Sequence, residues 1–123
     1  MHHPSSLTPA EQASLDVVIR EAEQACRAEI SVFIGAAAGD PRAFSTSLHN
    51  TLVLPARSVL VMVDPRRRIV EIVTGGHVRE RLTDDESRQA VTAMTERFAD
   101  GDLAGGLHRG IELLGELATP VVE

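Results

Sequence analysis

Apolar residues recur at helical spacing near the start of the chain and then predominate in a short segment at 30–34. Thr8–Glu11 (Thr-Pro-Ala-Glu) predicts a helix start, with an N-cap threonine, a proline at the first helical position and a glutamate that completes a capping box. Apolar side chains recur every three or four residues between Leu15 and Cys26. The apolar segment 30–34 then predicts a short strand that ends at Gly35.

A second helix is predicted to begin at Asp40-Pro41. Asp40 provides the N-cap, and Pro41 occupies the first helical position, where a proline removes no helical hydrogen bond. Phe44, Leu48 and Leu52 follow at helical spacing and predict the inner face of this helix.

The middle of the chain predicts a β-hairpin with one fully covered strand. Residues 59–63 are all apolar, and a short run without alternation is typical of a central strand covered on both faces. The turn 64–68 leads into a second strand at 69–74, and so short a turn favours antiparallel pairing. Strands 30–34 and 59–63 are joined through a helix, so they should be parallel with a right-handed crossover.

Two helices are predicted to close the chain. Thr83–Glu86 forms a second capping box, Gly101 ends the third helix, and Asp102 caps the fourth. Gly106 and Gly110 lie near the apolar stripe of the last helix. Because each glycine weakens a helix by up to about 1 kcal/mol relative to alanine, we expect another backbone to approach closely there.

Together these elements predict an α/β/α sandwich with the order α-β-α-β-β-α-α, in which about four helices cover a small mixed sheet. The length of 123 residues and the hydrophobic content of 43% fit one compact domain. We predict this domain over residues 7–119, after a frayed segment 1–6. Aromatic residues make up 2% of the chain, so the core should be aliphatic.

Charge and cysteine content disfavour several classes of function. A net charge of -6 repels nucleic acid and anionic membranes. All twelve basic residues are arginine, which excludes a lysine Schiff base and a P-loop lysine. Cys26 is the single cysteine and lies on an apolar stripe, where a small buried side chain is expected. With neither a signal-peptide pattern nor an apolar run of membrane-spanning length, a soluble cytoplasmic protein is expected.

The loop after the predicted hairpin is the first candidate site. In one interpretation its backbone N–H groups and two arginines bind an anion such as phosphate. In the other, the loop is solvated and its arginines pair with the acids at 84–86, which already satisfy the start of the next helix. The predicted ligand-binding residues are Gly75, Gly76, His77, Arg79 and Arg81.

Glu71 lies in the middle of a predicted strand, on the same face as its apolar second neighbours. A buried carboxylate needs a partner, for which Arg79, Arg81 and Arg109 are the candidates. Such a pair is either catalytic or structural. A catalytic site would require four candidates to converge on one cavity: Glu71, Arg79, Arg81 and Asp84.

Asp40 and Asp64 form a second candidate region. Both follow strands that should be parallel, so both should lie at the same end of the sheet, opposite the loop 75–82. Their oxygens could hold a divalent cation, but a helix cap and a turn residue are equally ordinary roles for aspartate. The run Arg66–Arg68 at the hairpin tip is either a solvated turn or a docking point for an acidic partner.

Several motifs together resemble a known family. They are an apolar strand ending in Asp64, a strand that contains Glu71 and ends in Gly75, and the phrase Leu82-Thr83-Asp84. The most specific motif is Phe-x-x-Gly-Asp-x-x-x-Gly-x-x-x-Gly, over residues 98–110. This body resembles the TPM domain family, which includes a thylakoid lumen phosphatase. The start at residues 7–11 is also similar to that of small actinobacterial TPM-like proteins of unknown function.

The resemblance implies an α/β/α sandwich but no single activity, since some members are phosphatases, some bind calcium and others are assembly or regulatory modules. Ala56-Arg57-Ser58 stands where typical members have an Asp-Asn-Gly-like turn, and 75–81 replaces a Gly-x-Gly-Leu-Glu-Gly-like loop. We therefore expect a non-catalytic binding or regulatory module with an unidentified protein partner. The alternative is a weak phosphatase that acts on phosphate esters with calcium or magnesium.

Overall fold

The computed structural model describes residues 6–118. Residues 1–5 of the predicted frayed segment and residue 119 of the predicted domain lie outside the described residues. Two short 3-10 turns that the sequence did not predict, η1 (Pro55–Arg57) and η2 (Val78–Glu80), flank the hairpin. The remaining elements follow the predicted order: α1 (Pro9–Cys26), β1 (Glu29–Ile34), α2 (Pro41–Asn50), β2 (Ser58–Asp64), β3 (Ile69–Thr74), α3 (Asp84–Ala99) and α4 (Leu103–Leu117).

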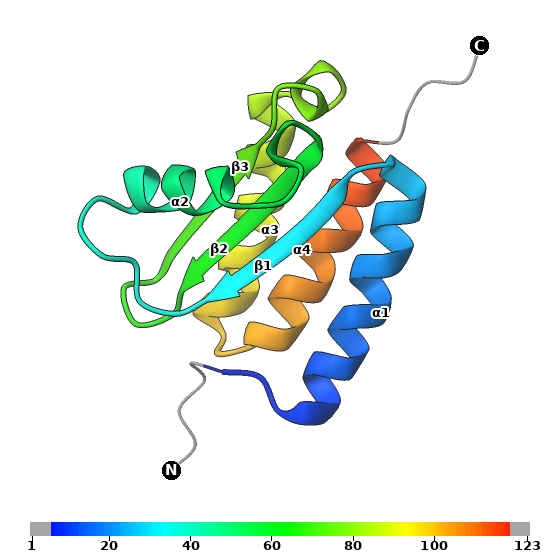
Figure 1. The fold of residues 1–123 in the computed structure, drawn as a ribbon. Helices are drawn as coiled ribbons and strands as arrows, with labels where there is room; N and C mark the ends of the chain where they lie inside the picture. The colour runs from blue at the N-terminus through cyan, green and yellow to red at the C-terminus, as the bar shows by residue number, and fades with distance from the viewer. Residues whose placement is uncertain (1–5, 119–123) are drawn as a thin grey trace.

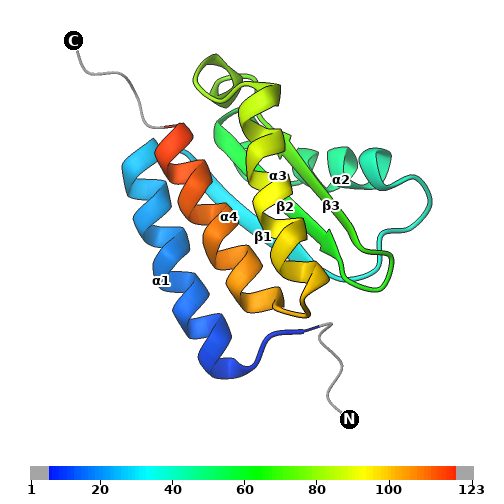
Figure 2. The same ribbon diagram turned by 180° about the vertical axis from the view of Figure 1, so that it is seen from behind.

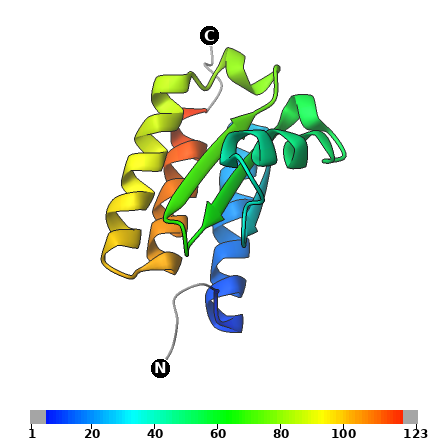
Figure 3. The same cartoon turned by 90° about the vertical axis from the view of Figure 1, so that its left-hand side faces the viewer.

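The sheet has the strand order β1-β2-β3 and is mixed, as predicted. Strand β1 pairs with β2 in parallel, with Val32 opposite Val61, and β3 pairs with β2 antiparallel, with Ile72 opposite Val61. Helix α2 covers one face, while α1, α3 and α4 cover the other (Figures 1 and 3). The predicted α/β/α sandwich is therefore confirmed.

Strand β2 separates two hydrophobic clusters, because its side chains alternate between the two faces of the sheet. Val59, Val61 and Val63 point into the larger cluster beneath α1, α3 and α4. Leu60 and Met62 point into the smaller cluster beneath α2. All seven residues of β2 are buried, which confirms the prediction of a central strand covered on both faces.

The predicted starts of the four helices are confirmed by side-chain hydrogen bonds, whereas α2 ends at Asn50, before Leu52, which was predicted to lie on its inner face. Both capping boxes are present, at Thr8 with Glu11 and at Thr83 with Glu86. Gly101 ends α3 with a φ of 80°, in the left-handed region that favours glycine. Helices α3 and α4 then run side by side across the back of the sheet (Figure 2).

Close packing of α3 on α4 explains one of the two glycines in the last helix. A Cβ atom at Gly106 would overlap the Phe98 ring and lie 3.0 Å from the backbone oxygen of Met94. The predicted close approach of another backbone is thus confirmed at Gly106. At Gly110 the neighbour is instead the side chain of Met94.

Within residues 6–118, none of the helices is both long and apolar enough to cross a membrane.

Candidate functional site

The loop that follows β3 packs against the turn η1 that precedes β2. The Gly75 N–H donates to the Ser58 carbonyl at 2.9 Å, and the His77 N–H donates to the Ala56 carbonyl at 3.0 Å. Val78 and Leu82 are fully buried, so the loop is anchored rather than solvated. Because the Gly75 N–H donates to the Ser58 carbonyl, this N–H is not available to bind an anion in the way predicted from the sequence.

Arg81, predicted as a ligand-binding or catalytic residue, joins the ends of two helices. Its Nη2 donates to the Cys26 carbonyl at 2.6 Å, and its Nε donates to the Ala118 carbonyl at 3.1 Å. These carbonyls belong to the C-terminal ends of α1 and α4, which carry partial negative charge. Arg79 is exposed, and its side chain makes no hydrogen bond or ion pair within residues 6–118, although its backbone N–H donates to the Gly75 carbonyl at 3.0 Å.

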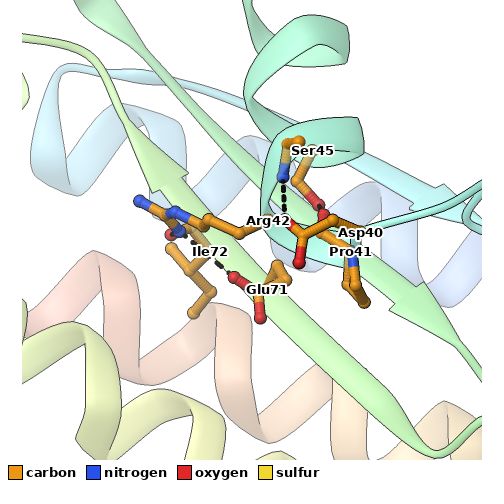
Figure 4. Close-up of polar contacts among 7 residues, drawn as sticks. Asp40, Pro41, Arg42, Ser45, Glu71 and Ile72 are labelled. Carbon is orange, nitrogen blue, oxygen red and sulfur yellow. Dashed lines mark hydrogen bonds and ion pairs between the residues drawn. The ribbon is translucent and has the colours of Figure 1, made fainter.

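Glu71 pairs with a residue that the sequence did not indicate (Figure 4). Its Oε1 lies 3.4 Å from Nη1 of Arg42 in the first turn of α2. The same Nη1 donates to the Ile72 carbonyl at 2.7 Å. Arg79, Arg81 and Arg109 were therefore the wrong partners. Glu71 points to the α2 face of the sheet. The alternation of side chains along β3 indicates that Glu71 shares a face with Ile69 and Val73, but it does not indicate that α2 covers this face.

The four predicted catalytic residues do not form one site. Glu71 lies under α2, whereas Arg81 reaches the helix ends on the opposite side of the sheet. Asp84 is exposed in the first turn of α3. The predicted pairing of the loop arginines with these acids is also wrong, because Asp85 pairs with Arg88.

Asp40 precedes the first turn of α2 and Asp64 ends β2, and each accepts backbone N–H groups. Asp40 accepts from the Ala43 N–H at 2.9 Å and caps α2 (Figure 4). Asp64 is 2% exposed and accepts from the backbone N–H of Ala37 at 3.0 Å and of Arg67 at 3.3 Å. Asp64 therefore ties the loop after β1 to the hairpin turn.

Arg67 provides the positive charge between these two segments. Its Nη1 donates to the carbonyl of Ala37 at 2.9 Å and to that of Gly39 at 3.2 Å. Carbonyl oxygens beside carboxylates are the ligands that calcium prefers, and here a guanidinium already contacts them. Among the described residues, no three His, Cys, Asp or Glu side chains cluster as metal ligands.

The pKa of Asp64 lies below its ordinary value, chiefly because the Ala37 N–H stabilises the charged carboxylate and the Arg67 N–H adds to this effect. A lowered folded-state pKa contributes stability that is present above the unfolded pKa and is lost as pH falls through the folded pKa. We expect Asp64→Asn to cost about 2 kcal/mol at pH 7. The difference from wild type should shrink below about pH 4.

Urea denaturation of both proteins between pH 7 and pH 2.5 measures this difference. Asp100→Asn removes one negative charge from an exposed position and serves as the control. An Asp64→Asn penalty that stays constant across the pH range would contradict the assigned role of this carboxylate.

A cavity of about 410 Å³ lies at the same end of the sheet, between the β2–β3 turn and the α3–α4 turn. Both turns meet at this end of the molecule (Figures 1 and 2). Residues from both turns and their flanking elements line it, among them Asp64, Arg66, Arg68, Ile69, Phe98 and Leu103.

The sequence of this chain matches the family described as Domain of unknown function (DUF5130) over residues 2–115. The chain belongs to the DUF5130 family. Relatives include the proteins named Uncharacterized protein Rv2468c and Uncharacterized protein MT2543, from two strains of Mycobacterium tuberculosis. Each is 26% identical to this DUF5130 domain over 120 residues, which cover 98% of the chain and 71% of the relative.

Two solved structures share the fold of this DUF5130 domain. The NMR structure of the BA42 protein from the psychrophilic bacterium Bizionia argentinensis matches with a TM-score of 0.81 and 22% identity, over 91% of this chain and 81% of that one. The N-terminal domain of the cg2496 protein from Corynebacterium glutamicum matches with a TM-score of 0.72 and 19% identity, over 93% and 75%. At these identities the matches establish the fold alone.

Sequence reasoning missed two features of the DUF5130 domain, Arg42 and the cavity. Arg42 occupies an unremarkable position in the first turn of a helix, and only the placement of α2 over β3 brings it to Glu71. The available signals for the cavity were the run Arg66–Arg68 and the phrase 98–110, which are about thirty residues apart in the sequence.

Proposed function

We propose that this DUF5130 domain is a non-catalytic binding module of TPM type. The proposal rests on one observation, that the predicted catalytic residues Glu71 and Arg81 lie far from each other in the fold. Acid–base chemistry needs its groups within hydrogen-bond reach of one substrate atom. Glu71 and Arg81 lie on opposite sides of the sheet, and each already has structural partners.

The cavity between the β2–β3 turn and the α3–α4 turn, which we call the hairpin-end cavity, supports the binding role. Small-molecule sites are concave, largely apolar and contain a few polar groups that fix the orientation of the ligand. This cavity combines apolar residues such as Phe98 and Leu103 with the arginines Arg66 and Arg68. It also lies at the carboxyl end of β2, the strand that pairs in parallel with β1, and ligands of α/β domains often bind at such strand ends.

A phosphatase screen tests this proposal. The domain is incubated with p-nitrophenyl phosphate and a panel of phosphate esters, with calcium, with magnesium and with EDTA. We expect no release of phosphate above the buffer blank under any of these conditions. Turnover that disappears in the Glu71→Gln or the Asp64→Asn variant would overturn the proposal. Loss of activity in a variant shows that the activity belongs to the domain and not to a contaminant.

One observation favours the alternative, a weak metal-dependent phosphatase. Asp64 is among the residues that line the cavity, together with Arg66 and Arg68, whose guanidinium groups are suited to phosphate. The two N–H groups that Asp64 already accepts weigh against a metal there. For this alternative, turnover should require calcium or magnesium and should be lost in Asp64→Asn while Glu71→Gln stays active.

A further inference from the structure

We propose that the hairpin-end cavity binds a small amphipathic anion, a molecule with one acidic group on a compact apolar body. This inference deepens the proposed function, since it rests on the domain being a binding module and names the chemistry of its ligand.

Two arginines at the cavity are available to a ligand. Arg66 and Arg68 are exposed, line the cavity and make no side-chain hydrogen bond or ion pair with any residue from 6 to 118. Arg67, between them, differs because its guanidinium is bound by the carbonyls of Ala37 and Gly39. The turn therefore directs one arginine into the fold and leaves the two on either side for an anion.

The nearby acids Asp64 and Asp102 form no ion pair with the side chains of Arg66 and Arg68. Asp64 accepts the backbone N–H groups of Ala37 and Arg67. Asp102 accepts the Gly105 N–H at 2.8 Å, and its other oxygen lies 4.0 Å from Arg97. Neither carboxylate pairs with the side chain of Arg66 or Arg68, and residues 64–68 contain three arginines and one aspartate, so the turn keeps a local positive charge in a chain whose net charge is -6.

The remaining lining of the cavity is suited to an apolar group. Val63 comes from the end of β2, Phe98 from the end of α3 and Leu103 from the start of α4, and all three belong to or pack against the larger hydrophobic cluster. A volume of about 410 Å³ falls within the range of cavities that hold small molecules. A fully hydrophilic anion would leave this apolar surface in contact with water, whereas an anion with an apolar body would cover it.

The backbone at Arg68 supports the same conclusion. Its φ is 55°, in the left-handed region where glycine or asparagine is more favourable than a long side chain. Residues held in such conformations often serve a function that offsets the local strain. A glycine here would complete the hairpin turn more easily but would remove one of the two free guanidinium groups from the cavity.

An NMR titration of the full chain tests the proposal, with 2-naphthoate as the probe and uncharged 2-naphthamide as its counterpart. We expect saturable changes in the amide signals of the β2–β3 turn and the α3–α4 turn on addition of 2-naphthoate. The amide should bind at least about tenfold more weakly, because it has no charge for the arginines to contact. An aspartate-rich peptide without apolar residues should bind no better than the amide.

Three variants complete the experiment. The double variant R66Q/R68Q should bind 2-naphthoate about tenfold more weakly than wild type. The double variant R57Q/R79Q removes the same charge at two exposed arginines outside the cavity and should bind like wild type. Arg68→Gly should lose affinity without a fall in melting temperature, because glycine relieves the left-handed residue. This last variant separates loss of binding from loss of folding.

Several results would overturn the inference: no saturable binding, equal affinity for acid and amide, equal binding by the aspartate-rich peptide, or unchanged affinity in R66Q/R68Q. If this titration fails, the domain can still be a binding module whose ligand binds at another place. Turnover in the phosphatase screen would contradict the proposed function itself, whatever the result of the titration.

Discussion

Replacing Gly75 with alanine is expected to lower the free energy of unfolding by about 3 kcal/mol. Gly75 is buried, and a Cβ atom there would overlap the backbone carbonyls of Pro55 and Ala56. Rotation of a side chain cannot relieve this overlap, because the atoms belong to the backbone of η1. Shifting η1 would also weaken the hydrogen bonds that join this loop to Ser58 and Ala56, donated by Gly75 and His77.

The adjacent glycine provides the matched control. A Cβ atom at Gly76 would have its nearest neighbour 4.0 Å away, in the side chain of Arg79, and Gly76 is not among the residues with positive φ. Gly76→Ala should therefore change stability by no more than about 0.5 kcal/mol. Thermal unfolding should place Gly75→Ala roughly 10 °C below wild type and Gly76→Ala close to it. Equal melting temperatures for the two variants would show that η1 does not pack on this loop as described.

The second large effect is expected at Arg81, where alanine should cost about 2–3 kcal/mol. The guanidinium donates to the Cys26 carbonyl at 2.6 Å and to the Ala118 carbonyl at 3.1 Å, and so links the C-terminal ends of α1 and α4. Hydrogen bonds from a charged donor are stronger than neutral ones. Their loss leaves two partly buried carbonyls without this donor and removes a positive charge from two helix ends.

Arg79 is the natural comparison, two residues earlier in the same loop. Its side chain is exposed and makes no hydrogen bond or ion pair within residues 6–118, so Arg79→Ala should alter stability by less than about 0.5 kcal/mol. Arg81→Lys should recover only part of the loss, because a single ammonium group cannot reproduce the planar guanidinium that reaches both carbonyls. Guanidinium chloride denaturation measures all three. A destabilisation of Arg79→Ala equal to that of Arg81→Ala would rule out the linking role.

The candidate site was less predictable than the fold, and the residues show why. Gly75, Arg79 and Arg81 share one loop, which led to the prediction of one anion site. In the structure they have three different roles, because Gly75 contacts η1, Arg81 contacts two helix ends and Arg79 faces solvent. A loop sequence contains the chemical groups but does not indicate which distant segments will approach them.

Local sequence patterns were sufficient to predict the order of elements, both capping boxes, the fully buried strand β2 and the pairing of β2 with β3. These features depend on residues a few positions apart, where periodicity and local hydrogen bonding dominate.

The partner of Glu71, the role of Arg81 and the position of the cavity depend instead on how the helices pack against the sheet. Arg42 and Glu71 are 29 positions apart, and Arg81 is 55 positions from Cys26 and 37 from Ala118. Such contacts arise when hydrophobic burial stacks the helices on the sheet. Burial is non-directional and depends on the whole chain, so the pattern of apolar positions specifies which faces are covered but not which polar groups meet at their edges.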